Sequence, residues 1–244
     1  MAAPLIAVAH GSRDPRSAAT VHELLDVVRA LAPALDVRAA FLDLSAPRLP
    51  DVLAGVHADG YGEAVVVPLL LGRAYHARVD IPGAVARTVR RFPRLTVRVG
   101  DVLGPDDRLE SVAFGRLVAA GAEPGDASLG VVLAGAGSSH ASANAAVARV
   151  AARWDWRTTA AFATAADPDV PSAIAALRAA GATRIAVGSW FLAPGLLPDR
   201  VTRLALDAEP SALVAAPLGA DPEVAAVVLS RYATAQLGTV RRAS

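Results

Sequence analysis

The sequence predicts an α/β protein made of two similar parallel-sheet domains that come from an internal duplication. Short apolar runs bounded by Gly, Pro or Asp alternate with longer segments that carry apolar and charged residues at helical spacing. The runs are apolar throughout, as in parallel strands that are buried on both faces. Similarity between the two halves of the 244-residue chain favours a duplicated fold over a single (β/α)₈ barrel.

Eight strands and eight helices are expected in alternation. The strands are predicted over Leu5–Ala9, Val37–Leu42, Ala64–Leu70, Leu95–Val99, Leu129–Ala134, Thr158–Ala163, Arg184–Trp190 and Ala212–Ala215. The helices are predicted over Ser17–Ala32, Pro47–His57, Arg78–Arg91, Asp107–Ala120, Ala141–Trp154, Pro168–Ala180, Leu197–Leu206 and Pro222–Gln236.

The duplication is visible in the segments that follow the second strand of each half. FLDLSAPRLPDVLAGV, which starts at Phe41, aligns with FATAADPDVPSAIAAL, which starts at Phe162. The alignment pairs Pro47 with Pro168, and the segment AVAHGS in the first half matches the stretch that ends at Ser138. Both halves therefore repeat one structural unit.

The repeat sets the expected domain boundaries. We predict a catalytic domain over residues 1–120 and a degenerate second domain over residues 129–244. Residues 121–128 are small, polar and rich in Gly and Pro, which is typical of a linker.

Composition excludes several functional classes. The 24 basic residues are all Arg and are balanced by 23 acidic residues, so no excess of positive charge favours a nucleic acid or an anionic membrane as partner. The absence of Lys excludes a Schiff base and a P-loop lysine. The absence of Cys excludes disulfides, thiolate metal sites and cysteine nucleophiles.

The apolar segments also bear on location. The N-terminal stretch MAAPLIAVAHGSRDPR lacks the basic region of a signal peptide, and no apolar run approaches the ~18 residues of a membrane span. We therefore expect a cytoplasmic protein that acts on a small molecule.

Three polar residues distinguish the first half from the second. His10, Asp43 and His76 align with Ala136, Thr164 and Leu197. Each of the three follows one of the first three strands, and ligands of open α/β sheets bind at the carboxyl ends of the strands. We expect them to converge on one functional site, in a protein with one active half and one scaffolding half.

Two imidazoles and a carboxylate suit Fe²⁺, Co²⁺, Ni²⁺ or Zn²⁺. Structural interpretations remain open for each residue taken alone. His10 could hydrogen-bond a backbone carbonyl, and Asp43 could cap the helix that begins near Pro47. A histidine phosphatase is disfavoured because Ala9 stands where the Arg of its R-H-G triplet is required.

At this point the sequence resembles a known family. HGSRDPR after the first strand, FLDLSAPRLPDVL at the second and PLLLGRAYHARVDIP at the third are similar to the sirohydrochlorin chelatases, the class II chelatases. The resemblance covers the first half in order and continues into the degenerate second half, as in the two-domain members. It implies a bilobal chelatase-like fold and insertion of Fe²⁺ or Co²⁺ into sirohydrochlorin, with iron slightly favoured, for siroheme or cobalamin biosynthesis.

The resemblance also implies roles for individual residues. The family's two metal-binding histidines correspond to His10 and His76, and its acidic residue corresponds to Asp43, where many members have Glu. These three are the expected catalytic residues. Arg13 and Arg73, which are next to the histidine motifs, are expected to bind substrate carboxylates.

No cofactor is required on this interpretation, the partners are the tetrapyrrole and the divalent metal, and a monomer is possible. The alternative functions are a non-catalytic metal or tetrapyrrole carrier and a periplasmic-type binding module. The second is disfavoured by the lack of an export signal.

Overall fold

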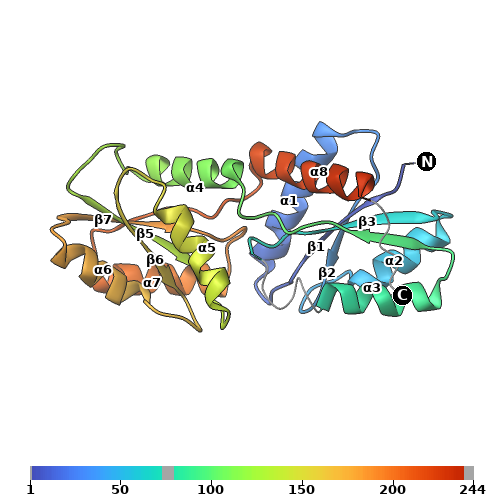
Figure 1. Ribbon diagram of the computed structural model, residues 1–244, viewed down its shortest axis with the longest axis horizontal. Coiled ribbons are helices and arrows are strands. Elements are labelled where there is room, and N and C mark those ends of the chain that lie inside the picture. Colours follow the sequence, from blue (N-terminus) through green and yellow to red (C-terminus); the bar gives the residue numbers. More distant parts are fainter. Residues whose placement is uncertain (1, 73–79, 239–244) are drawn as a thin grey trace. The chain divides into compact units, whose positions relative to one another are not determined.

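The computed structural model describes residues 2–72 and 80–238, in which eight strands and eight helices alternate. The first half contains β1 (Leu5–Ala9), α1 (Pro15–Leu31), β2 (Val37–Phe41), α2 (Leu49–Ala58), β3 (Glu63–Pro68), α3 (Ile81–Arg91), β4 (Thr96–Val99) and α4 (Asp107–Ala119). The second half contains β5 (Leu129–Gly135), α5 (Ala141–Ala151), β6 (Arg157–Phe162), α6 (Val170–Ala179), β7 (Arg184–Ser189), α7 (Leu196–Ala208), β8 (Leu213–Val214) and α8 (Pro222–Leu237). The predicted α/β class and its duplicated parallel sheets are confirmed (Figure 1).

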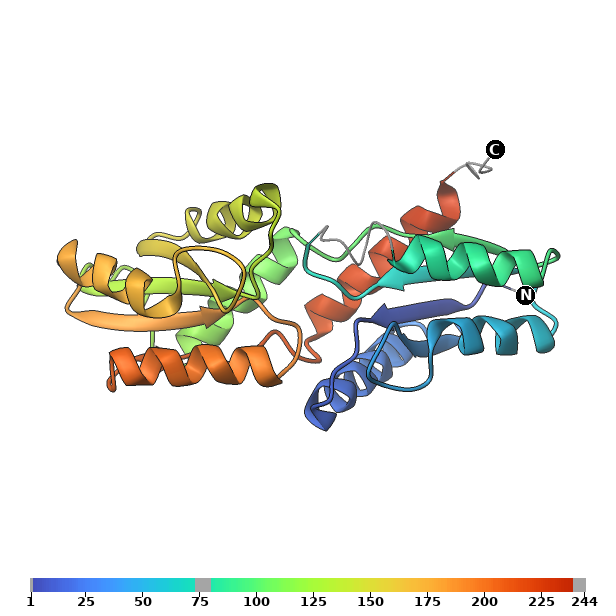
Figure 2. The ribbon, with the colours of Figure 1, turned by 90° about the horizontal axis from the view of Figure 1, so that it is seen from below.

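The two sheets have the same topology. One has the strand order β2-β1-β3-β4 and the other β6-β5-β7-β8, and all pairs are parallel. Every residue of the central strand β1 is at most 8% exposed, which agrees with the predicted burial on both faces. Each sheet lies between helices (Figure 2). In each sheet the first strand, β1 or β5, has the second strand of its half on one side and the third on the other. The chain therefore proceeds in opposite directions from the first strand, and a switch point lies at the carboxyl ends of the two central strands.

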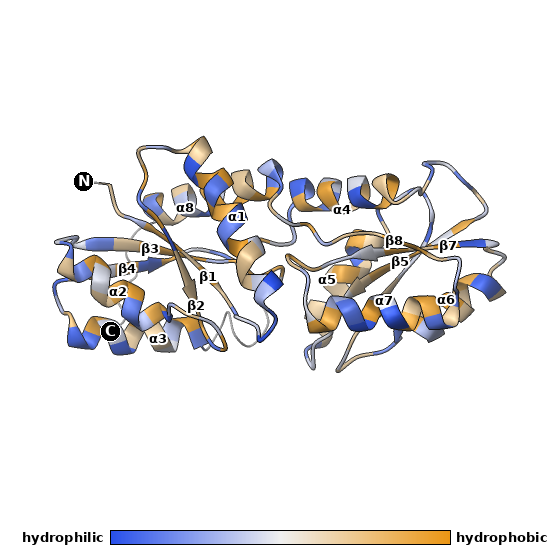
Figure 3. Ribbon diagram, turned by 180° about the vertical axis from the view of Figure 1, so that it is seen from behind, coloured by the Kyte–Doolittle hydropathy of each residue, from blue (hydrophilic) through white to orange (hydrophobic). Residues whose placement is uncertain are grey.

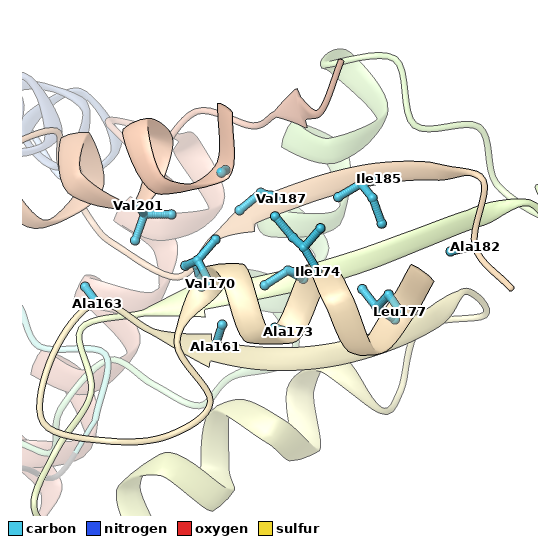
Figure 4. Packing of buried hydrophobic residues seen from close by; sticks show 13 residues of the cluster. Ala161, Ala163, Val170, Ala173, Ile174, Leu177, Ala182, Ile185, Val187 and Val201 are labelled. Carbon is cyan, nitrogen blue, oxygen red and sulfur yellow. The ribbon is translucent and has the colours of Figure 1, made fainter. Parts of the chain in front are cut away.

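Apolar side chains hold the helices on the sheets. Helices α2 and α3 pack against one face of the first sheet, and α6 and α7 pack against the corresponding face of the second. Val170 and Ile174 of α6 point toward Val187 of β7 and Val201 of α7 in this second core (Figure 4). Helix α7 alternates hydrophobic and hydrophilic residues, whereas β5 is apolar along its length (Figure 3).

Local rules explain where the helices begin. The Asp14 carboxylate accepts the backbone N–H of Arg16 and caps α1, and Pro15 occupies the first turn. The helix therefore starts two residues before the predicted Ser17. Helix α2 begins at Leu49, with Pro50 in its first turn, rather than at the predicted Pro47.

The fourth helix of each half packs on the other half's sheet. The chain divides into unit 1, residues 1–104 and 220–244, and unit 2, residues 105–219. Helix α8 packs on α1 and β3 of unit 1, and α4 packs on β7 of unit 2, where Leu117 is fully buried. This division differs from the predicted domains of residues 1–120 and 129–244, which assign each helix to the sheet of its own repeat.

The predicted linker, residues 121–128, lies inside unit 2. Ala122 is buried in the core beside Leu117, and the Trp156 indole N–H donates to the Glu123 carbonyl at 2.9 Å. Trp156 also stacks on Phe114 of α4, with ring centroids 4.7 Å apart. The segment therefore closes the packing of α4 against unit 2 instead of separating two domains. None of the helices in the described ranges is long and apolar enough to span a bilayer.

Candidate functional site

Two predicted site residues of unit 1 lie at the carboxyl edge of its sheet, where the first two strands end. His10 directly follows β1, and Asp43 lies two residues after β2. The backbone N–H of Asp43 donates to the His10 carbonyl at 2.8 Å, which continues the pairing of β1 with β2 beyond the strands. Parallel strand ends thus bring His10 and Asp43 together as predicted. His10 is exposed to solvent.

Gly11 permits the two loops to approach each other. Its φ is +95°, a left-handed conformation that favours glycine, and a Cβ at this position would lie 1.6 Å from the Asp43 carbonyl oxygen. No side chain fits there. The glycine next to His10 is therefore a requirement of the geometry that places His10 beside Asp43.

A hydroxyl connects the same two loops. The Ser45 Oγ accepts the backbone N–H of Ser12 at 3.1 Å and donates to the Ser12 carbonyl at 3.0 Å. The Ser12 side chain in turn accepts the backbone N–H of Asp14 at 3.0 Å, just before the cap of α1. These bonds fix the loop that carries His10 relative to the loop that carries Asp43.

The Asp43 carboxylate is held in its ionised form. Its Oδ1 accepts the backbone N–H of Leu44 at 2.8 Å and the Arg48 guanidinium at 2.9 Å. These two bonds, with smaller contributions from the charges of Arg48 and His10, hold the pKa of Asp43 below its usual value. Asp43 does not cap α2, because Arg48 occupies the N-cap position without a side-chain cap bond.

Arg48 takes a part in the site that the sequence argument missed. Its Nη1 also donates to the Leu42 carbonyl at 2.8 Å, so one guanidinium joins the end of β2 to the carboxylate. Its proximity to the FLDLSAP motif was visible, but only the fold of the loop shows which group it contacts. Ser45 was missed for the same reason.

The remaining predicted residues are partly outside the described ranges. Arg13 is exposed in the loop between His10 and the cap of α1. His76 and Arg73, and the nearby Arg78, lie outside the described residues, in the segment after β3. Within the described ranges no three His, Asp or Glu side chains gather as a metal site, and of the three predicted catalytic residues the structure describes His10 and Asp43.

Unit 2 has the same backbone at this edge but different side chains. The backbone N–H of Thr164 donates to the Ala136 carbonyl at 3.0 Å, matching the bond from Asp43 to His10. Gly137 has a φ of +88°, and a Cβ on it would lie 1.8 Å from the Thr164 carbonyl oxygen. The predicted pairings of His10 with Ala136 and of Asp43 with Thr164 are therefore confirmed.

The fold and this edge together define a class: a duplicated parallel α/β protein in which one unit carries an imidazole and a carboxylate at the carboxyl edge of its sheet and the other does not. Comparisons with known proteins agree with this description. The family model described as CbiX matches residues 4–120 and 130–235, one range in each half. The chain belongs to the CbiX family.

The relatives of the chain include iron and cobalt enzymes. It is 30% identical over 135 residues to a sirohydrochlorin ferrochelatase of Priestia megaterium; the match covers 54% of this chain and about half, 49%, of that protein. It is 28% identical over 120 residues to a sirohydrochlorin cobaltochelatase of Methanosarcina acetivorans, covering 46% of this chain and 92% of that protein. The structure of SirB from Bacillus subtilis with Fe³⁺ shares the fold, with a TM-score of 0.83, 23% identity and 96% coverage of each chain.

Proposed function

We propose that this protein is an ATP-independent sirohydrochlorin chelatase that inserts Fe²⁺ or Co²⁺, with iron as the first metal to test. The observation that carries the proposal is the exposed His10 beside an ionised Asp43 at the carboxyl edge of the sheet of unit 1. The equivalent positions in unit 2 hold Ala136 and Thr164, although the backbone is the same. Membership of the CbiX family supports the same conclusion.

Metal insertion requires the metal to lose water ligands and the macrocycle to lose two pyrrole protons. A neutral imidazole can bind the incoming ion and then accept a proton once the ion has moved to the pyrrole nitrogens. We assign these roles to His10 and, from the sequence resemblance, to His76. The products are the metallated tetrapyrrole and two protons, so neither an oxidant nor a cofactor is needed.

Asp43 supports this chemistry as a fixed negative charge. Both of its described hydrogen bonds use Oδ1, so Oδ2 is the oxygen that can approach the metal or the imidazole. A carboxylate beside a histidine orients the ring and raises its basicity. Because the pKa of Asp43 is lowered, the carboxylate stays charged through the range in which imidazoles titrate.

Arg13 fits the expected role of binding substrate carboxylates. It is exposed three residues after His10, and its counterpart in unit 2 is Ser139, because Gly11 and Gly137 are equivalent. A guanidinium pairs with carboxylates in two parallel hydrogen bonds, which suits a polycarboxylate such as sirohydrochlorin. Arg73 is proposed for the same role from the sequence.

A multiple-turnover assay tests the proposal. Sirohydrochlorin is mixed anaerobically with Fe²⁺ or with Co²⁺, and its absorbance change is followed with and without the protein. We expect turnover well beyond one equivalent with at least one metal, and the two rates rank the metals. Stoichiometric binding of metal or tetrapyrrole without turnover would instead establish the carrier function, and neither binding nor turnover would refute both.

A further inference from the structure

Leu44, which follows Asp43, has an unusual backbone for its residue type. Its φ is +61°, in the left-handed region that favours glycine, and the residue is 45% exposed. A large apolar side chain is therefore held in solvent on a strained backbone. Strained positions of this kind gather at functional sites, where the surrounding structure maintains them.

The contacts that hold Leu44 in place are those of the candidate site. Its backbone N–H donates to the Asp43 carboxylate at 2.8 Å, and the next residue, Ser45, donates its backbone N–H to the Asp43 carbonyl at 2.7 Å. Ser45 is in turn bonded to Ser12. The direction of the Leu44 side chain is thus set by the same loop that positions the carboxylate.

Unit 2 separates the backbone requirement from the side chain. Ala165 is the counterpart of Leu44, with a φ of +58°, and it is also exposed. The repeated loop therefore adopts this conformation with a methyl group alone. The additional carbons of Leu44 occur only in the unit that carries His10 and Asp43, which is the pattern expected of a residue that contacts the substrate.

We propose that Leu44 determines specificity for the tetrapyrrole by covering part of the apolar face of the macrocycle beside His10 and Asp43. This inference rests on the proposed function. A tetrapyrrole has a flat apolar ring and a charged rim, so its recognition needs an apolar contact as well as cations for the carboxylates. Leu44 supplies the apolar contact, and Arg13 is assigned to the rim.

The experiment compares Leu44→Ala and Leu44→Gly with the matched control Ala165→Gly. Leu44→Ala should raise the KM for sirohydrochlorin about five- to tenfold, because roughly half of a Leu side chain remains to be covered. The effect on kcat should be smaller, since His10 and Asp43 are unchanged. The KM for the metal should stay the same.

Stability distinguishes this role from ordinary packing. Leu44→Gly relieves the positive φ and should raise the unfolding midpoint while it raises the KM for sirohydrochlorin. Ala165→Gly should also raise the midpoint, with no change in either KM.

Two results would overturn the inference. One is a KM for sirohydrochlorin in Leu44→Ala within twofold of the wild-type value, and the other is a lower midpoint in Leu44→Gly. Failure of the proposed function itself is distinguishable, because it would show first in the wild-type protein as an absence of both turnover and sirohydrochlorin binding.

Discussion

Replacing Ser45 with Ala removes the hydroxyl that connects the two loops of the site. Ser45 makes two hydrogen bonds to the backbone of Ser12, at 3.1 and 3.0 Å, and both residues are half-buried. A neutral hydrogen bond contributes about 0.5–1.5 kcal/mol net, so the pair is worth about 1–3 kcal/mol. Water can reach the released groups because they are partly exposed, which places the loss near the lower end, about 1–1.5 kcal/mol.

Amide hydrogen exchange at Ser12 measures this loss directly. A loss of about 1.4 kcal/mol corresponds to roughly tenfold faster exchange, if the amide exchanges through local opening of the loop. Ser45→Thr keeps the hydroxyl and should exchange at nearly the wild-type rate. Metal insertion should slow in Ser45→Ala, because His10 and Asp43 lose their fixed relative position. Unchanged exchange at Ser12 in Ser45→Ala would refute the reasoning.

Three further predictions concern the fold and the electrostatics. Gly11→Ala should lower the free energy of unfolding by about 3 kcal/mol or more, because the added Cβ meets the Asp43 carbonyl. The control Gly60→Ala, at a φ of +88° with no heavy atom within 4 Å of the added Cβ, should cost only about 1–2 kcal/mol from backbone strain. Equal losses for the two variants in denaturant unfolding would contradict this reasoning. Burial raises the pKa of Glu110, although the charge of Arg153 lowers it. The contribution of Glu110 to stability is therefore fully present at pH values below its pKa in the unfolded chain, and it is lost as the pH rises through its pKa in the folded protein. Glu110→Gln should therefore gain stability relative to wild type between pH 4 and pH 7, measured by Trp fluorescence because all three Trp residues lie in unit 2; a relative loss over that range would show the sign to be wrong. Activity should fall as the pH is lowered and the imidazoles protonate, and an acid limb only near pH 4 would assign the loss to a carboxylate instead.

The strands and the helix order could be predicted because they follow from local patterns. Apolar runs such as Leu5–Ala9 are buried on both faces, and the first helix was predicted in its place, although it starts at Pro15, after the Asp14 cap, and not at Ser17. The repeat also predicted which residues share a position, since His10 and Ala136 occupy equivalent backbone. Placing His10 and Asp43 together needed only the rule that parallel strands end at one edge.

The association of α4 and α8 with the two sheets could not be predicted in this way. Both helices follow the last strand of a repeat, and the sequence pattern shows an apolar face without showing which sheet it covers. Leu117 of α4 packs in unit 2, and Tyr232 of α8 is buried in unit 1, where its hydroxyl donates to the Ala3 carbonyl at 2.6 Å. Such long-range choices depend on side-chain packing.

The roles of Arg48, Ser45 and Leu44 were also beyond the sequence argument. Each depends on the conformation of one loop, including the positive φ of Leu44, which no pattern of apolar and polar residues specifies. The structure adds these residues to the predicted site, while the predicted roles of His76 and Arg73 stay predictions.

The most direct test of the central claim is the insertion rate of His10→Ala, which gives unit 1 the residue found in unit 2. The matched control is His140→Ala, which removes an exposed histidine at the start of α5 that makes no capping bond. With sirohydrochlorin and the preferred metal under anaerobic conditions, turnover should fall at least about a hundredfold in His10→Ala, as expected for a lost proton acceptor and metal ligand, and should stay at the wild-type rate in His140→Ala. A wild-type rate in His10→Ala would contradict the assignment of the site.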